Sequence, residues 1–365
     1  MNHRFTEISK WVGRTIGLVG ATGVLLLTAC GGVTTDSGTG DLGGGAAQGV
    51  DPSAQFANPF STATDGANTV YVADTSNQTI RAIDLTTGKV TGLAGKNGAF
   101  GTDDGIGESA RFNLPKGLVV VGPHLFVADS ANFTIRKIVR ATGAVTTVAG
   151  SPGLPGSDDG VGPAARFGSP KALAADGDDV LYVADAFNNT IRRFTLSTGE
   201  VATVVGPAAG LSTPQGLAVN DQYVYVSDTD HHVILQVEKL TGTVSVLAGR
   251  DRISGAADGD GAVATFFQPH GMALSGTQLY VCDSGNHTIR RIDLSGAAYP
   301  VSTVAGQAGV SGSADGVGAQ ARFNMPLGLS TDGTRLFVAD TFSSVVKQIT
   351  LATGNVTTLD GRIPL

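Results

Sequence analysis

After about residue 55 the chain is built of short apolar runs separated by polar turns. Runs such as Val70–Ala73 and Leu125–Ala128 are rich in Val, Tyr, Phe and Leu and hold four to six residues, while Gly, Asp, Asn and Thr fill the gaps between them. Short runs of this composition, bounded by turn residues, predict β-strands, and no stretch of this part keeps a helical period. We therefore predict an all-β domain.

The apolar runs belong to a repeat that occurs six times. Its most regular phrase is Tyr/Phe-Val-x-Asp, and the spacings between copies are 55, 56, 43, 55 and 57 residues. The aspartates of the phrase are Asp74, Asp129, Asp185, Asp228, Asp283 and Asp340. A period of this length indicates a repeat architecture in which each copy is one supersecondary unit.

Each repeat contains four predicted strands. The first follows Pro-x-Gly, the second is the Val-x-Asp run, the third resembles Thr-Ile-Arg-x-Ile, and a Thr-Gly turn leads to the fourth. Glycine in such turns supplies the positive φ that tight hairpins need. Six four-stranded antiparallel units predict a six-bladed β-propeller over residues 55–365. Because repeat and blade are in phase, we expect the first and last blades to meet mainly by side-chain packing.

The phrase Tyr-Val-Ala-Asp-x-x-Asn-x-x-Ile-Arg, preceded by Pro-x-Gly-Leu, resembles the pattern of NHL-repeat propellers. The resemblance covers residues 55–361. It implies the propeller fold, but this family hosts many functions, so it implies no single activity.

The first 54 residues read as a signal and a tether. Arg4, Lys10 and Arg14 precede a short apolar stretch that ends in Leu-Thr-Ala-Cys30. This ending resembles a bacterial lipoprotein signal, so we expect residues 1–29 to be removed, Cys30 to be lipidated and 30–54 to be a Gly-rich tether. Gly31 resembles the outer-membrane-sorted class, which predicts a bacterial cell-envelope location, periplasmic or surface-facing. An ordinary secretory signal is the alternative.

Charge and cysteine content narrow the possible partners. The formal net charge is −7, and removal of residues 1–29, which carry +2, leaves about −9 with no basic stripe. This balance argues against a nucleic-acid partner. With Cys30 lipidated, Cys282 has no partner for a disulfide, and we expect it to be a small buried residue of a monomeric protein.

The two faces of the predicted propeller differ. Connections between the second and third strands (Asp-x-x-Asn) share one face with the connections between blades, such as Thr102–Val120; we call this the long-loop face. The opposite, tight-turn face carries hairpins such as Asp65-Gly66 and the Thr-Gly turns. Long loops on a rigid scaffold usually carry binding.

The inter-blade phrase Asp-Gly…Ala-Arg-Phe-x-x-Pro is written four times. We interpret its Asp-Gly as a turn and its Ala-Arg-Phe as a helical turn whose Phe fills the gap between blades. Calcium binding by pairs such as Asp103-Asp104 is the alternative, although such a loop lacks a bidentate Glu. The repeated Asp and Arg of the strands, as in Asp129 and Arg136, are interpreted as loop caps and ion pairs. Blade 4 lacks the inter-blade phrase, which predicts a notch beside it.

The middle residue of Pro-x-Gly should lie at one end of the propeller axis, which we call the axial mouth. The six residues of the axial mouth are Phe60, Lys116, Lys171, Gln215, His270 and Leu327. Lys116, Lys171, Gln215 and His270 form a polar, partly cationic arc that suits a small anionic or carbohydrate-like ligand. A water-filled channel without a ligand is the alternative.

Histidines gather in blades 4 and 5. His231, His232, His270 and His287, with Asp230 or Asp228, offer ligands for zinc, as in three-ligand catalytic sites. The resemblance to NHL-like peptidyl-hydroxyglycine amidating lyases, which hold zinc with histidines near the axis, points the same way. Exposed loop histidines without metal are the alternative, so no cofactor is certain and zinc or calcium stays open.

These observations favour a lipid-anchored cell-envelope propeller that acts as a ligand- or protein-binding scaffold through its long-loop face. The alternative is a metal-dependent lyase or lactone hydrolase with its site at the axial mouth. The sequence lacks a Ser/His/Asp arrangement and a Gly-rich phosphate loop, so we lean towards a non-enzymatic role. A purely structural envelope protein is a third hypothesis.

Overall fold

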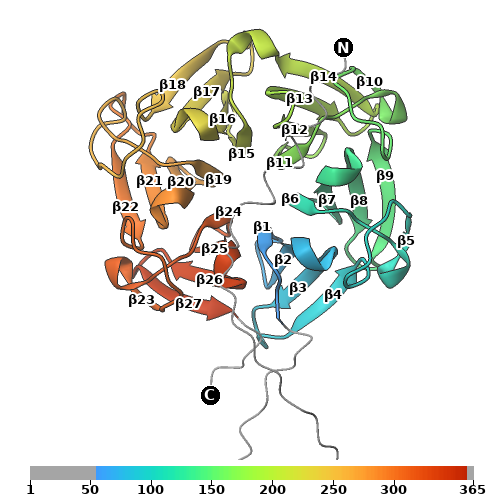
Figure 1. Cartoon of the computed structure of the whole chain (residues 1–365), viewed down its shortest axis with the longest axis horizontal. Helices are drawn as coiled ribbons and strands as arrows, with labels where there is room; N and C mark the ends of the chain where they lie inside the picture. The colour runs from blue at the N-terminus through green and yellow to red at the C-terminus, as the bar shows by residue number, and fades with distance from the viewer. Residues whose placement is uncertain (1–54, 360–365) are drawn as a thin grey trace, which may run out of the picture. The chain divides into compact units, whose positions relative to one another are not determined.

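Six antiparallel sheets surround a central axis in the computed structural model, which describes residues 55–359 (Figure 1). This confirms the predicted six-bladed β-propeller. The predicted signal segment, Cys30 and the tether up to residue 54 lie outside the described residues, so their processing stays a prediction. Within the described part, no helix is long and apolar enough to cross a membrane.

In each blade the strands run from the axis outward in chain order (Figure 1). Blade 1 comprises β1 (Pro59–Thr64), β2 (Thr69–Asp74), β3 (Thr79–Asp84) and β4 (Val90–Ala94). Blade 2 comprises β6 (Pro115–Val121), β7 (His124–Asp129), β8 (Thr134–Val139) and β9 (Ala144–Ala149). Blade 3 comprises β11 (Pro170–Asp176), β12 (Val180–Asp185), β13 (Thr190–Thr195) and β14 (Glu200–Val205).

The second half of the ring follows the same plan. Blade 4 comprises β15 (Pro214–Val219), β16 (Tyr223–Asp228), β17 (Val233–Glu238) and β18 (Val244–Ala248). Blade 5 comprises β19 (Pro269–Ser275), β20 (Gln278–Asp283), β21 (Thr288–Asp293) and β22 (Val301–Ala305). Blade 6 comprises β24 (Pro326–Thr331), β25 (Arg335–Asp340), β26 (Val345–Thr350) and β27 (Asn355–Leu359).

Three blades carry a fifth strand that the sequence reading did not predict. The two-residue strands β5 (Gly105–Ile106), β10 (Gly160–Val161) and β23 (Gly316–Val317) pair with the outer strands β9, β14 and β27. Each comes from the inter-blade phrase and begins at the glycine of its Asp-Gly pair. The phrase therefore first covers the outer edge of the next blade and only then returns to the axis, which protects an otherwise unpaired strand edge.

The innermost strands of neighbouring blades lie backbone against backbone, and this contact requires glycine. A Cβ on Gly216 would collide with the carbonyl oxygen of His270, and one on Gly328 would collide with the carbonyl oxygen of Phe60. The Pro-x-Gly phrase thus encodes the close approach of adjacent inner strands around the axis.

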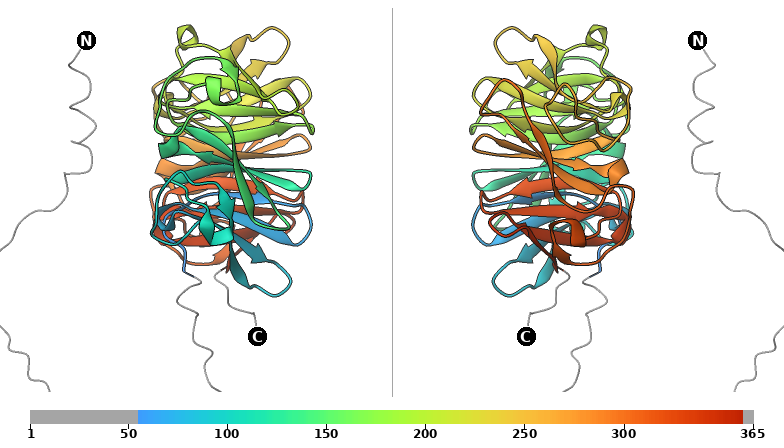
Figure 2. Two further views of the ribbon diagram at one scale, coloured as in Figure 1. Left: turned by 90° about the vertical axis from the view of Figure 1, so that its right-hand side faces the viewer. Right: turned by 90° about the vertical axis from the view of Figure 1, so that its left-hand side faces the viewer.

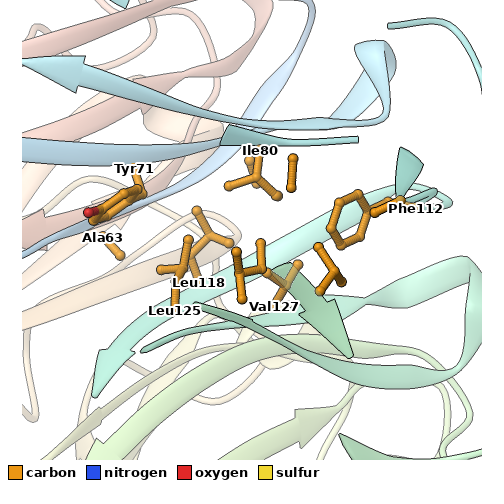
Figure 3. Packing of buried hydrophobic residues seen from close by; sticks show 12 residues of the cluster. Ala63, Tyr71, Ile80, Phe112, Leu118, Leu125 and Val127 are labelled. Carbon is orange, nitrogen blue, oxygen red and sulfur yellow. The ribbon is translucent and has the colours of Figure 1, made fainter. Parts of the chain in front are cut away.

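The hydrophobic core lies between the blades rather than within them. In the cluster between blades 1 and 2, Phe112 packs with Ile80 and Val127, as Figure 3 shows. The equivalent phenylalanines are fully buried: Phe112, Phe167, Phe266 and Phe323. This bears out the role assigned to the Phe of the inter-blade phrase.

Two details of the inter-blade phrase differ from the prediction. The helical turn is formed by the three residues before Ala-Arg-Phe, as in Gly107–Ser109, because Ala110 is already extended and the chain must reach inward to bury Phe112. The predicted notch beside blade 4 is filled instead: Leu211 is 4% exposed and packs in the cluster between blades 3 and 4. An aliphatic side chain thus replaces the missing Phe.

The ring closes between blades 6 and 1 without a shared strand among residues 55–359. The hydroxyl of Thr341 donates to the carbonyl oxygen of Pro59 across 2.7 Å, and that of Thr62 donates to the carbonyl oxygen of Phe337 across 2.8 Å. Phe56 and Val72 pack against Phe337 in the closing cluster. Closure by side-chain packing is therefore confirmed for the described residues.

Candidate functional site

The structure places the two kinds of connection on opposite faces. The strands run across the thickness of the propeller, so the connections project from two sides (Figure 2). The side-chain amide of Asn132, in a strand 2–3 loop, donates to the carbonyl oxygen of Gly101 in an inter-blade connection across 2.6 Å. On the other face, the Arg140 guanidinium lies 3.6 Å from the carboxylate of Asp65 in a hairpin turn. The long-loop and tight-turn faces are thus distinct.

The aspartate of each Val-x-Asp phrase is a buried loop cap. In blade 2, Asp129 accepts hydrogen bonds from the backbone N–H of Asn113 at 2.7 Å and from the Asn132 amide at 2.8 Å, and it pairs with Arg136. Burial raises the pKa of Asp129 to about 6, against the opposing effect of Arg136. Because this arrangement recurs around the ring, it holds the blades together and does not mark a single reactive centre.

The second aspartate of the inter-blade phrase is also committed to the scaffold. Asp104 accepts hydrogen bonds from the Arg136 guanidinium at 2.7 Å and from the Thr147 hydroxyl at 3.1 Å. Asp159, Asp258 and Asp315 make the same contacts in blades 3, 5 and 6, where Lys347 replaces the arginine in blade 6. The predicted Asp-Gly turn is not formed, because Gly105, Gly160 and Gly316 begin the short strands β5, β10 and β23, and the preceding aspartates bind the scaffold instead.

The axial mouth is built by six β-bulges. The register between each inner strand and its neighbour shifts at the middle residue of Pro-x-Gly, as between Pro170 and Ala172. A bulge leaves one residue outside the ladder and re-aims its side chain. Phe60, Lys171, Gln215 and Leu327 consequently line one small cavity at the axis.

Lys116 completes this mouth from β6. Its terminal nitrogen lies 4.8 Å from the centre of the Phe60 ring, and Lys171 is near enough for its charge to act on Lys116. Burial, together with the neighbouring Lys171 charge, lowers the pKa of Lys116 well below its usual value. Neither lysine forms an ion pair with a carboxylate in the described part of the chain. The mouth therefore holds two neighbouring amines that no carboxylate of the described chain neutralises, and an anion placed there would favour their charged forms.

His270 is the buried member of the axial mouth. It is 7% exposed, and burial lowers its pKa to about 4, with further small effects from Lys171 and Lys116. Its Nδ1 lies 2.9 Å from the carbonyl oxygen of Gln268, so Nδ1 carries the proton and donates it. Nε2 of this neutral imidazole is then a hydrogen-bond acceptor.

A ring of large side chains closes the channel below the mouth. Leu118, Leu173, Leu217, Met272 and Leu329, with Thr62, line the small cavity of about 40 Å³ near the mouth. The same six residues line a second cavity of about 240 Å³ towards the other end of the axis. They form the boundary between the two cavities. A molecule larger than water that enters at the mouth would therefore not pass beyond it along the axis.

His231, His232 and His287 stand at loop positions where other blades have different residues. His231 stands where most blades have the loop Asn, and its Nδ1 lies 2.8 Å from the Asp228 carboxylate. Nδ1 of His232 accepts the backbone N–H of Gln268, and that of His287 accepts the N–H of Met325. Gln78 and Asn189 make the equivalent contact with their side-chain oxygens. These histidines link neighbouring blades.

The structure thus brings together only part of the predicted site. Lys116, Lys171, Gln215 and His270 meet at the axial mouth. Asp230 instead accepts a hydrogen bond from the Thr213 hydroxyl at 2.6 Å, beside the inner end of blade 4. Between residues 55 and 359, no three His, Cys, Asp or Glu side chains gather as metal ligands. Cys282 is fully buried, as predicted.

Sequence reasoning missed two features of the mouth. The Phe60 ring, which stacks on Lys116, was placed at the mouth but not among its binding residues, although an aromatic residue beside a cation is a recognised pairing. The ring of leucines that closes the channel was also missed. The sequence does indicate this ring, because a large apolar residue follows the Pro-x-Gly position in five of the six repeats.

Fold and repeat geometry together define a six-bladed β-propeller of the NHL type. A model of the NHL repeat matches residues 266–292, which span strands β19 to β21. The chain is 27% identical to human NHL repeat-containing protein 2 over 307 residues, 71% of this chain and 42% of that protein. The chain is an NHL-repeat β-propeller.

Solved structures agree on the fold. A structural genomics protein from Bacteroides thetaiotaomicron superposes with a TM-score of 0.63 at 23% identity, covering 80% of this chain and 69% of that one. An auxiliary nutrient binding protein from the same species gives a TM-score of 0.62 at 16% identity, covering 83% and 70%. The chain spans less than half the length of the curated NHL repeat-containing relatives it matches.

Proposed function

We propose that this propeller is a lipid-anchored binding protein of the bacterial cell envelope, and that its axial mouth binds a small hydroxylated anion such as a sugar acid. The observation that carries the proposal is the meeting of Lys116 and Lys171 at the axis without any carboxylate partner in the described part. Burial and the neighbouring Lys171 disfavour the charged form of Lys116, and an anion that enters the mouth stabilises that form.

The neighbours of the lysines indicate the rest of the ligand. Nε2 of His270 accepts hydrogen bonds, and the Gln215 amide both donates and accepts them. Ligand hydroxyl groups would satisfy both side chains, whereas a simple inorganic anion would leave the His270 acceptor unused. The Phe60 ring provides an apolar surface beside the cations, which suits the C–H face of a sugar. An anionic carbohydrate combines all of these requirements.

The envelope location rests on the sequence of the first 54 residues. The Leu-Thr-Ala-Cys30 ending and the Gly-rich stretch after it support a lipidated, tethered domain. An auxiliary nutrient binding protein shares the propeller fold, which is compatible with a role in ligand capture.

The test is a titration of the full chain, purified in mild detergent, with D-galacturonate by calorimetry. D-galactose and acetate serve as the uncharged and the hydroxyl-free controls. Replacing Lys116 or Lys171 by Ala should weaken galacturonate binding by about tenfold or more, since a charged hydrogen bond contributes ~1.5–3 kcal/mol. Lys96→Ala, at an exposed long-loop position outside the mouth, should leave it unchanged.

Two results would overturn the proposal. One is the absence of measurable galacturonate binding to the wild-type chain. The other is binding that galactose matches, or that survives both lysine substitutions. Residues 55–359 gather no set of three candidate metal ligands, so no observation among them favours the metal-dependent alternative.

A further inference from the structure

A second cavity, separate from the axis, opens between blades 2 and 3 on the tight-turn face. Its volume is about 500 Å³, within the range of small-molecule sites. Phe126 and Val148 of blade 2 face Phe194 and Leu196 of blade 3 across it. Phe126 and Phe194 belong to the buried cluster between these blades, and Val148 and Leu196 pack against it, so the floor of the cavity is apolar and firmly held.

The equivalent cleft between blades 1 and 2 is filled by a cationic side chain. Arg140 lies over the Tyr71 ring at 5.9 Å, and its guanidinium reaches the Asp65 carboxylate at 3.6 Å. Between blades 3 and 4, Lys239 makes a similar bridge to Asp176 at 2.6 Å. Each bridge joins the strand 3–4 turn of one blade to the hairpin turn of the preceding blade and closes the cleft.

Between blades 2 and 3 every part of that bridge is missing. Leu196 stands at the position of Arg140, and the hairpin turn of blade 2 is Gly122-Pro123, which offers no carboxylate. Phe126 stands at the position of Tyr71 and has no hydroxyl group. Because no cationic side chain bridges the two blades here and no larger side chain takes its place, the cavity stays open. Leu85, Leu294 and Leu351 hold the same position at three other junctions, so this cation bridge occurs only between blades 1 and 2 and between blades 3 and 4 of the described chain.

Opposite charges lie on the two sides of the cavity. Lys137 comes from blade 2, and Asp178 comes from the hairpin turn of blade 3. Neither forms an ion pair with another residue of the described chain. Asp179 is already engaged, because its carboxylate accepts hydrogen bonds from the Ser197 N–H at 2.7 Å and hydroxyl at 2.9 Å. The free groups at the rim are thus one ammonium and one carboxylate.

We propose that this cavity, which we call the 2–3 cleft, binds a free amino acid with a large apolar side chain. The apolar side chain would contact Phe126, Phe194 and Leu196, which remove it from water. The α-carboxylate would pair with Lys137 and the α-ammonium with Asp178. His124 stands edge-on to Phe126 with ring centroids 6.3 Å apart and adds a polar group at the rim. This site is independent of the axial mouth and needs no anionic sugar.

The experiment titrates the full chain, purified in mild detergent, with L-leucine and L-phenylalanine by calorimetry, and saturation-transfer NMR identifies the ligand protons in contact. N-acetyl-L-phenylalanine amide, which lacks both charges, and D-galactose are the comparison ligands. Binding of the free amino acids, and at least tenfold weaker binding of the uncharged analogue, is the expected result. The strongest saturation should fall on the side-chain protons.

Three substitutions in the 2–3 cleft and one control substitution elsewhere locate the site. Leu196→Trp should fill the cleft and abolish binding, whereas Leu351→Trp, at the equivalent position between blades 5 and 6, should leave it intact. Asp178→Asn and Lys137→Gln alter exposed or half-buried side chains and should each weaken binding about tenfold. If Leu196→Trp fails to fold, the affinities of Asp178→Asn and Lys137→Gln still test the proposal.

The proposal is wrong if neither amino acid binds, if the uncharged analogue or galactose binds as tightly, or if Asp178→Asn and Lys137→Gln leave the affinity unchanged. Lys116→Ala should not affect amino-acid binding. Loss of amino-acid binding in that variant would place the ligand at the axial mouth and would also overturn the proposal.

Discussion

The Arg136 guanidinium donates a hydrogen bond to the buried carboxylate of Asp129 across 2.8 Å, and neither side chain is more than 1% exposed. The same guanidinium reaches Asp104, so it ties a strand, a loop cap and the inter-blade connection together. In blade 4, where the inter-blade phrase is missing, the equivalent residue is Leu235. A cationic residue, Arg or Lys, thus stands at this position in blades 2, 3, 5 and 6, where the inter-blade phrase supplies an acidic partner.

Arg136→Leu should destabilise the protein by ~3–5 kcal/mol, because it leaves Asp129 charged and buried without its cation. Urea denaturation followed by circular dichroism measures this free energy of unfolding. Arg252→Leu is the control, since the Arg252 side chain is 72% exposed and should change stability by less than ~0.5 kcal/mol. A loss below 1 kcal/mol in Arg136→Leu would show that the pair contributes little.

Gly216→Ala should destabilise the ring, because the added methyl group collides with the carbonyl oxygen of His270 in the neighbouring inner strand. We expect a cost of ~1–3 kcal/mol, typical of overpacking at a rigid contact. Gly92→Ala is the matched control, since a Cβ there meets no atom within 4 Å. Equal thermal midpoints for the two variants would contradict the backbone-to-backbone packing around the axis.

His270 should make stability depend on pH. Its pKa in the folded state is about 4, below the ~6.5 of an unfolded chain, so the unfolded state binds more protons between these values. The stability that the neutral imidazole contributes is fully present above pH ~6.5 and is lost as pH falls towards 4, by up to ~1.4 kcal/mol per pH unit. Comparing urea denaturation of wild type and His270→Gln at several pH values isolates this effect. Parallel pH profiles would argue against a buried neutral His270.

Anion binding at the axial mouth should take up a proton. Burial and Lys171 lower the pKa of Lys116, so an anion that stabilises the charged ammonium raises this pKa again. Affinity for galacturonate should therefore increase as pH falls from 9 towards 6. Calorimetry in two buffers of different ionisation enthalpy measures the protons taken up. Identical binding enthalpies in both buffers would show that both lysines are already charged.

Cys30→Ser should release the protein from membranes. The expected lipidation depends on the thiol of Cys30, and the serine hydroxyl does not substitute for it. Fractionation of bacterial cells and labelling with a radioactive fatty acid measure the change. A wild-type chain that is fully soluble, or one that keeps its label after the substitution, would favour an ordinary secretory signal.

The sequence alone was sufficient to predict the fold, because the residues that form each blade lie close together within one repeat. The Val-x-Asp run, the Thr-Gly turn and the glycine of Pro-x-Gly act within a blade or with its immediate neighbour, so their pattern is visible in a window of about one repeat. Phe112 could be assigned to the gap between blades for the same reason, whereas the contact of Asp104 with Arg136 was not predicted. The lysines of the axial mouth were also found, since the middle residue of Pro-x-Gly recurs at the same place in every blade.

What only the tertiary structure decided are the features that depend on several blades at once. Whether Lys116 and Lys171 touch, whether His232 binds a metal or a backbone N–H, and whether leucines close the channel all depend on distances across the axis or between blades. The open 2–3 cleft likewise depends on residues of two blades, Phe126 and the short turn at Gly122 in blade 2 and Leu196 in blade 3. No local sequence pattern shows such a combination, because these residues come together only when the ring places blades 2 and 3 side by side.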